Sequence, residues 1–214
     1  MSLRHLWRVA LLIIVGLSVA GCFAPDFTYV ADSSDNAYFK VPPSWHEVSP
    51  SSLEAVQGQS GSQGTYLWSR AYDDSATPSV KHVFSASPRP VVYASVLGLS
   101  SSQRDAVSFN SMRDLLLPVT SAARNAASAA HIGLAGFASL ADEVITDRNH
   151  DRGIREIFDY NLGTTPETFD LTVMANSTTT KLYFLLVHCS ATSFVANYPE
   201  IEKVVGSFTL GGGS

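Results

Sequence analysis

The chain has 214 residues, 45% of them hydrophobic, with 14 Lys and Arg against 19 Asp and Glu. This length and this hydrophobic content suit one globular domain rather than two. The net acidic charge and the scattered basic residues exclude the basic stripe that binding to a row of phosphates requires. Nucleic acid is therefore not an expected partner.

The first 22 residues have the form of a secretory signal. A charged start precedes the apolar run Val9–Ala20, which is shorter than the ~20 residues needed to span a bilayer. The run closes in Val19-Ala20-Gly21-Cys22, and this ending resembles the lipobox of bacterial lipoproteins. The resemblance implies cleavage between Gly21 and Cys22, a diacylglycerol on the Cys22 thiol, and a mature chain that begins at Cys22. A chance cysteine after an ordinary signal peptide is the alternative.

The predicted lipid determines where we expect the protein to be. A diacylglycerol brings two acyl chains, and each buried methylene contributes roughly 0.8 kcal/mol, so anchoring by this group is stable. Removal of residues 1–21 takes away two arginines and no acid, which leaves 12 basic against 19 acidic residues and a net charge of −7. An acidic body is repelled by anionic headgroups. We therefore expect a lipid-anchored protein on the extracytoplasmic face of the cell membrane, with no cofactor besides the lipid.

Once Cys22 is lipidated, Cys189 is the sole remaining cysteine. One thiol cannot form an intramolecular disulfide, so stability must come from the core. Cys189 ends the apolar segment Leu182–Cys189, which predicts a small buried hydrophobe rather than a reactive thiol.

Polar composition predicts a tether over residues 22–36 and a flexible tail over residues 211–214, which leaves one domain at 37–210. In the first half of this domain, alternating apolar residues predict a strand at Ala37–Val41, which Pro42-Pro43 ends, and Trp45 is expected to plug the edge of the core. Capping-box spacing predicts a short helix over Ser52–Gln57. Three further strands are expected at Tyr66–Tyr72, Lys81–Ala86 and Val91–Leu97.

In the second half the period first changes to that of helices. A helical stripe runs through Val107–Leu116, and the alanine-rich segment Val119–Ala130 predicts a second helix. Four strands then follow, of which the two middle ones are expected to have one face in water and the last to lie at the sheet centre: Asp142–Thr146, Ile154–Asn161, Thr168–Ala175 and Lys181–Cys189. Pro199 is expected to start a final helix, with Tyr198 and Ile201 facing inward, before Ser207–Leu210 closes the fold.

The order of these features carries a family resemblance. The strand and turn Tyr38-x-x-Val41-Pro-Pro-Ser-Trp45, a mid-chain helix, a meander, a central apolar strand and a last helix running into Gly206-Ser207-Phe208 occur together. Over about Asn36–Leu210 the chain resembles the PsbP-like superfamily, and within it the LpqN-type lipoproteins of actinobacteria. The resemblance implies an α+β fold, an antiparallel sheet with helices on both faces, and a non-catalytic role in binding or assembling other proteins. The segment Ser100–Leu140 is not shared with this family.

The sequence offers little support for catalysis or for a metal site. The nucleophile motif Gly-x-Ser-x-Gly is missing, and Gly58-Gln59-Ser60-Gly61 lacks its spacing. The mature histidines have no metal-binding spacing: His46, His82, His131, His150 and His188. Asp147–Asp151 resembles a calcium loop, but Gly153 comes one residue late and Phe158 replaces the bidentate glutamate. We expect neither a bound metal nor an enzyme.

One strand offers a candidate binding face. Tyr66, Trp68, Arg70 and Tyr72 alternate along the predicted strand, so they should share one side of it, and these are residue types that anchor interfaces. The alternative is that this side packs on a helix while Leu67 and Ala71 face outward. The function expected from the sequence is a lipid-anchored binding or assembly module. The alternatives are a carrier of an apolar ligand, held between the sheet and the Ser100–Leu140 helices, and an envelope hydrolase without a recognisable motif.

Overall fold

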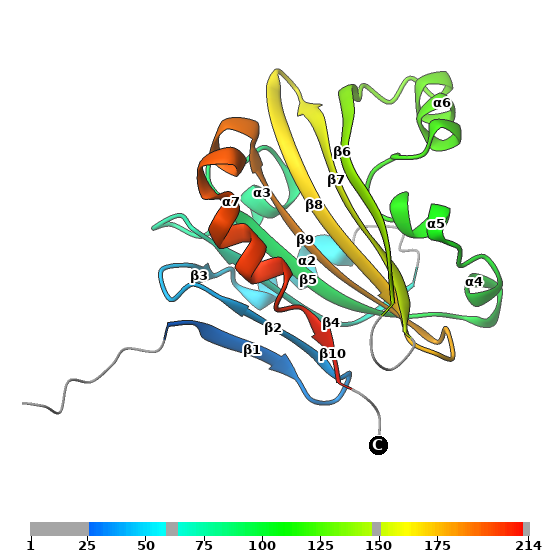
Figure 1. Cartoon of the computed structure of the whole chain (residues 1–214), viewed down its shortest axis with the longest axis horizontal. Helices are drawn as coiled ribbons and strands as arrows, with labels where there is room; N and C mark the ends of the chain where they lie inside the picture. Colours follow the sequence, from blue (N-terminus) through cyan, green and yellow to red (C-terminus); the bar gives the residue numbers. More distant parts are fainter. Residues whose placement is uncertain (1–25, 59–63, 147–150, 212–214) are drawn as a thin grey trace, which may run out of the picture.

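The computed structural model describes residues 26–58, 64–146 and 151–211 and contains two antiparallel sheets (Figure 1). The large sheet has seven strands in the order β3-β4-β5-β9-β8-β7-β6, and the small sheet has three in the order β1-β2-β10. The strands of the large sheet are β3 (His46–Glu47), β4 (Thr65–Asp73), β5 (Val91–Gly98), β6 (Ala135–Thr146), β7 (Arg152–Leu162), β8 (Thr165–Ala175) and β9 (Lys181–Ser190). The predicted α+β class is confirmed.

The nearly continuous apolar run of β9 lies at the centre of the large sheet, between β5 and β8, as predicted. Its side chains supply two separate cores. Leu185, Val187 and Cys189 belong to the core beneath helix α7 (Ala191–Val205) and the small sheet. Phe184 and Leu186 belong to the opposite core, which is covered by the helices α2 (Pro50–Gln57), α3 (Val80–Phe84) and α5 (Phe109–Arg113). Figure 1 shows α7 crossing the front of the large sheet with α2 and α3 behind it.

The small sheet corrects the predicted tether. Thr28–Asp32 forms β1, which pairs antiparallel with β2 (Ala37–Val41). Val30 is buried in the α7-side core, while Tyr29 is exposed. A single inward side chain is a weak periodic signal, so the strand was missed. On the other edge of β2, β10 (Thr209–Leu210) closes the sheet.

Three predictions for segments that are helical in the structure were inaccurate. Lys81–Ala86 was expected as a strand, but Val80–Phe84 is helix α3, capped by the Ser79 hydroxyl, which accepts a hydrogen bond from the Lys81 amide. Of the stripe at 107–116 only α5 is helical, and a separate short helix, α4 (Ser101–Asp105), precedes it; each has its own capping box, while α6 (Ser121–Ala129) lies where expected. Helix α7 begins at Ala191, so Pro199 lies inside it rather than at its start, and Tyr198 is exposed.

The face of β7 and β8 that was expected to be wet is covered. Asp170 on β8 is fully buried beneath α7, where Arg155 of β7 donates to both of its carboxylate oxygens at 3.0 and 2.6 Å. Arg155 also pairs with Glu202 of α7. A polar alternation therefore marked a buried ion network and not a solvent-facing surface. Within the described ranges, no helix is both long and apolar enough to cross a membrane.

Candidate functional site

The predicted lipidation and cleavage residues, Cys22 and Gly21, lie outside the described residues. The structure nevertheless limits how far the domain could stand from an anchor at Cys22. Only five residues separate Cys22 from Thr28, where β1 begins. At roughly 3.5 Å per residue, these span about 20 Å even when fully extended.

Three of the four residues of the candidate binding face lie on one side of β4. Trp68 and Tyr72 lie on the side of the small sheet, where each ring centroid is 6.3 Å from that of Phe39 in edge-to-face geometry. The guanidinium carbon of Arg70 lies 5.8 Å from the Trp68 ring centroid, and its Nε is 3.4 Å from Glu47. These three side chains are half-buried.

Tyr66 lies on the opposite side of the sheet, so the prediction that it shares this face was wrong. The pairing of β4 with β5 is regular from Trp68 to Asp73, but its register shifts between Tyr66 and Trp68. The bulge breaks the period of two, so Tyr66 packs on the α2-side core. Ala71 is fully buried in that same core, whereas Leu67, at the bulge, is exposed.

Two histidines are held by carboxylates, but each pair is built into the fold. His82 Nδ1 lies 2.7 Å from the buried carboxylate of Asp73, which also accepts from the amides of Ser75 and Ser79. These bonds fix the turn that leads into α3. Within the described ranges, no three His, Cys, Asp or Glu side chains come together as a metal-binding group.

The second pair, Glu167 and His188, is fully buried. His188 Nδ1 lies 3.2 Å from the Glu167 carboxylate, and its Nε2 lies 3.2 Å from the Val83 carbonyl oxygen. Since a carbonyl can only accept, Nε2 must donate, and one proton is shared between Nδ1 and the carboxylate. The imidazole stacks on Phe169 with centroids 5.4 Å apart. Both ring nitrogens are thus committed to structural contacts.

A small apolar pocket lies over His188, and we call it the insert pocket. Its volume is about 180 Å³. Its walls come from α3, from the segment after α5 and from the sheet, and they include Val83, Phe84, Leu116, Leu117, Phe169 and Leu186. It lies between the sheet and the Ser100–Leu140 segment, where the sequence suggested an apolar cavity.

Strand β6 forms an exposed edge of the large sheet. Strand β6 ends the sheet and pairs through one side only, with β7. No backbone hydrogen bond to any other part of the described chain is found for its twelve residues. The pairing with β7 has two register shifts before Ala141 and is regular from there to Thr146. Leu140 and Val144 are 57% and 56% exposed.

The sequence prediction missed half of this strand, since only Asp142–Thr146 was expected. The bulges explain the omission, because they break the alternation between Ala135 and Ala141. The run of small and apolar residues from Leu134 to Ala141 was the signal available.

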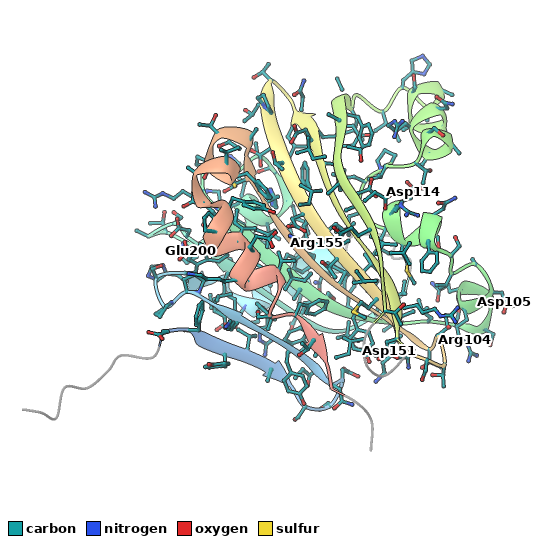
Figure 2. The ribbon with its side chains drawn as sticks, in the orientation of Figure 1. Arg104, Asp105, Asp114, Asp151, Arg155 and Glu200 are labelled. Carbon is teal, nitrogen blue, oxygen red and sulfur yellow. The ribbon has the colours of Figure 1, made fainter. Side chains whose placement is uncertain are left out.

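A buried carboxylate lies beneath α5. Glu156 of β7 is 3% exposed, and its Oε2 has no hydrogen-bond partner in the described structure. Arg113 of α5 lies 3.6 Å away but donates to Asp142 of β6, at 3.1 and 2.7 Å. Burial, followed by the nearby charge of Asp142, raises the pKa of Glu156 to about 7. Figure 2 labels Asp114, which follows α5 and contributes to the same rise.

Comparisons with known proteins identify the fold. No protein-family model matches the chain, and no curated protein matches it in sequence. The solution structure of cyanobacterial PsbP (CyanoP) from Synechocystis sp. PCC 6803 is similar with a TM-score of 0.55 and 12% identity, over 92% of this chain and 99% of that one. The chain has the PsbP-like fold.

Two other solved structures are more distantly similar. LpqN of Mycobacterium tuberculosis, described as involved in cell envelope biogenesis, aligns with a TM-score of 0.48 and 11% identity over 87% of this chain and 91% of that one. The Ran-binding protein Mog1p of Saccharomyces cerevisiae aligns with a TM-score of 0.44 and 8% identity over 87% and 96%. The similarity to CyanoP confirms the α+β fold that the resemblance implied.

Proposed function

We propose that this protein is a lipid-anchored binding or assembly module on the extracytoplasmic face of the cell membrane, and that it binds an extended segment of a partner protein along the outer edge of β6. The observation that carries the proposal is the stretch Ala141–Thr146, which pairs regularly with β7 on one side and makes no backbone hydrogen bond to the described chain on its outer side. Exposed sheet edges bind extended peptides by adding a strand, with backbone hydrogen bonds for affinity and alternate side chains for specificity.

The chemistry of β6 supports such a role. Proteins usually protect edge strands by shortening them or by charging them. The opposite edge strand, β3, is two residues long, whereas β6 has twelve residues and exposes Leu140 and Val144. The strand carries two acids: Asp142 is paired with Arg113, whereas Glu143, next to Val144, is exposed and makes no ion pair within the described ranges. The edge thus offers both backbone groups and apolar side chains.

The predicted anchor would hold the domain at the membrane through its small sheet. Five residues between Cys22 and β1 keep the small sheet within about 20 Å of the lipid. We therefore expect the partner to be a membrane protein or another envelope component at the same surface.

The edge is tested by photo-crosslinking in cells of the source organism. A benzophenone amino acid replaces Leu140 or Val144 in the full-length chain, and Val195 on α7, 77% exposed, serves as the matched control. A discrete crosslinked product from positions 140 and 144 but not from 195 supports the proposal. Equal products from all three positions, or none from the edge, would contradict it.

The anchor is tested separately with Cys22→Ala. We expect this variant to lose incorporation of labelled fatty acid and to leave the membrane fraction, because two acyl chains provide the attachment. Cys189→Ala is the control, since that thiol is buried. Retention of Cys22→Ala on membranes would refute lipid anchoring.

The insert pocket favours a second candidate, a carrier of an apolar ligand. Its 180 Å³ is close to a cavity that holds benzene but smaller than the ~300 Å³ usual for whole ligands. The pocket therefore suits one apolar group rather than an entire lipid. Leu117→Trp would fill it, and loss of binding of a small fluorescent dye such as 1-aminoanthracene in that variant, with crosslinking at β6 unchanged, would favour the carrier.

A further inference from the structure

The arginines of the described ranges fall into two groups. Four of the seven form ion pairs: Arg70, Arg89, Arg113 and Arg155. Arg124 instead lies over the Phe137 ring, 3.9 Å from its centroid, and donates to the Val119 carbonyl. The other two, Arg104 and Arg152, make no ion pair in the described structure, and both line one groove.

This arginine groove lies at one end of the large sheet. It has a volume of about 600 Å³ and is bounded by α4 and α5, by the start of β7 and by the turn from β8 to β9. Figure 2 shows Arg104 on α4 beside the end of the sheet where Asp151 is labelled. Asp151 is buried, and no Asp or Glu of the described residues lines the groove. A site without acid is notable in a chain of net negative charge.

Hydroxyl groups extend the polar side of the groove. Ser177 and Thr179 lie on the β8–β9 turn, and neither hydroxyl makes a hydrogen bond in the described structure. The turn itself is held firmly, because the Asn176 carboxamide oxygen accepts from the amides of Thr180 and Lys181 at 2.9 and 3.0 Å. Two guanidinium groups and two hydroxyls, placed on three elements, thus line the same groove and are available to donate to an anion there.

The groove also has an apolar part. Val107, Phe109 and Met112 line it from the α4–α5 segment, and Phe109 is 37% exposed. Arg104 donates to the Ser101 hydroxyl at 3.1 Å, but neither arginine is neutralised by an acid of the described residues. An exposed aromatic ring in the same groove offers a contact to an apolar group attached to the anion.

We propose that the arginine groove binds a phosphate ester that carries an apolar group. Arg104 and Arg152 bind the phosphate, the hydroxyls of Ser177 and Thr179 donate to its remaining oxygens, and Phe109 contacts the apolar group. A tetrahedral phosphate accepts from several directions, which suits donors placed on three elements better than a planar carboxylate does. This site is independent of the proposed β6 interface and of the anchor.

The test is calorimetric titration of the full-length chain in dodecyl maltoside with phenyl phosphate. We expect saturable binding that weakens about tenfold in Arg104→Gln and in Arg152→Gln, the loss typical of one charge-assisted contact. Arg89→Gln is the matched control, because it removes the same charge from an exposed pair with Asp74. Affinity should also fall as salt is raised.

Three further ligands test which chemical group the arginine groove recognises. Inorganic phosphate should bind more weakly than phenyl phosphate, and phenyl glucoside, which lacks the charge, should not bind. Equal binding of phenylacetate would overturn the preference for phosphate, and unchanged affinity in the Arg104→Gln, Arg152→Gln double variant would overturn the site.

The source of the phosphate is separated by reconstitution. If a lipid headgroup occupies the groove, the protein in phosphatidylcholine proteoliposomes should bind phenyl phosphate at least about tenfold more weakly than the protein in dodecyl maltoside, because the lipid carries a phosphate ester, the maltoside carries none, and neither has a net charge. Equal affinity in the proteoliposomes and in the detergent would assign the groove to a soluble ester.

Discussion

Replacement of Glu156 by glutamine should make the folded protein less sensitive to pH. The carboxylate is buried at 3% exposure, its Oε2 has no hydrogen bond in the described structure, and the nearest cation, Arg113, donates to Asp142 instead. Folding therefore disfavours the ionised form of Glu156. Glutamine keeps the shape of the side chain and cannot ionise.

The magnitude follows from the raised pKa. Glu156 has a pKa of about 7 in the folded chain against 4.5 for an ordinary glutamate, which corresponds to about 3 kcal/mol at about 1.4 kcal/mol per pH unit. Because the folded pKa is raised, the protonated side chain contributes its full stability below pH 4.5 and loses it as the pH rises through 7. About 2 kcal/mol of this loss should fall between pH 5 and 8.

The assay is urea unfolding of the wild type and of Glu156→Gln at pH 5, 6, 7 and 8. The fall in the free energy of unfolding from pH 5 to pH 8 should be about 2 kcal/mol smaller in the variant than in the wild type. Glu54→Gln, which removes an exposed carboxylate from α2, should leave the pH profile unchanged. The reasoning is refuted if Glu156→Gln keeps the wild-type profile or if Glu54→Gln alters it equally.

Three other predictions test the core. Cys189 should not react with a thiol reagent at pH 8 unless denaturant is added, because burial raises the pKa of its thiol to about 12; rapid native labelling would contradict this. Arg155→Leu should lower the free energy of unfolding by about 3–5 kcal/mol, because it leaves the buried Asp170 carboxylate without its partner. Adding Asp170→Leu should restore much of this loss. A double variant as unstable as Arg155→Leu would argue against the importance of the ion pair. Gly153→Ala should destabilise the protein by about 2 kcal/mol or more, because the new Cβ would lie 2.1 Å from a carbonyl oxygen of β8. In the control variant Gly133→Ala the new Cβ meets nothing within 4 Å, so stability should not change. Equal melting temperatures for the two variants would show that β7 and β8 can separate at Gly153.

The sequence alone determined the elements whose signal is local. The apolar run of β9 requires cover on both faces wherever it lies, so its central position could be predicted. The alternation in β2 and the burial of Trp45 follow from the same reasoning about apolar faces. The α+β class is the sum of such local signals.

The binding-face prediction failed because the pairing of β4 with β5 interrupts the alternation of side chains along β4. The rule that every second residue shares a face holds from Trp68 to Tyr72, but a bulge against β5 sends Tyr66 to the other core. A bulge depends on which strand pairs alongside and in what register, and one strand's sequence does not contain that information.

The buried Asp170–Arg155 pair and the arginine groove also depend on contacts between elements that are separate in the sequence. Asp170 has the sequence signature of a solvent-facing residue, yet it is buried beneath α7. Its burial is tolerated because Arg155 from the neighbouring strand compensates its charge. The arginine groove likewise joins Arg104 and Arg152, which are far apart along the chain and lie on different elements. Sequence periodicity decides which side of an element is apolar. Only the packing of elements against one another decides which charges are paired, which are left free, and which edge of the sheet, here β6, remains open to a partner.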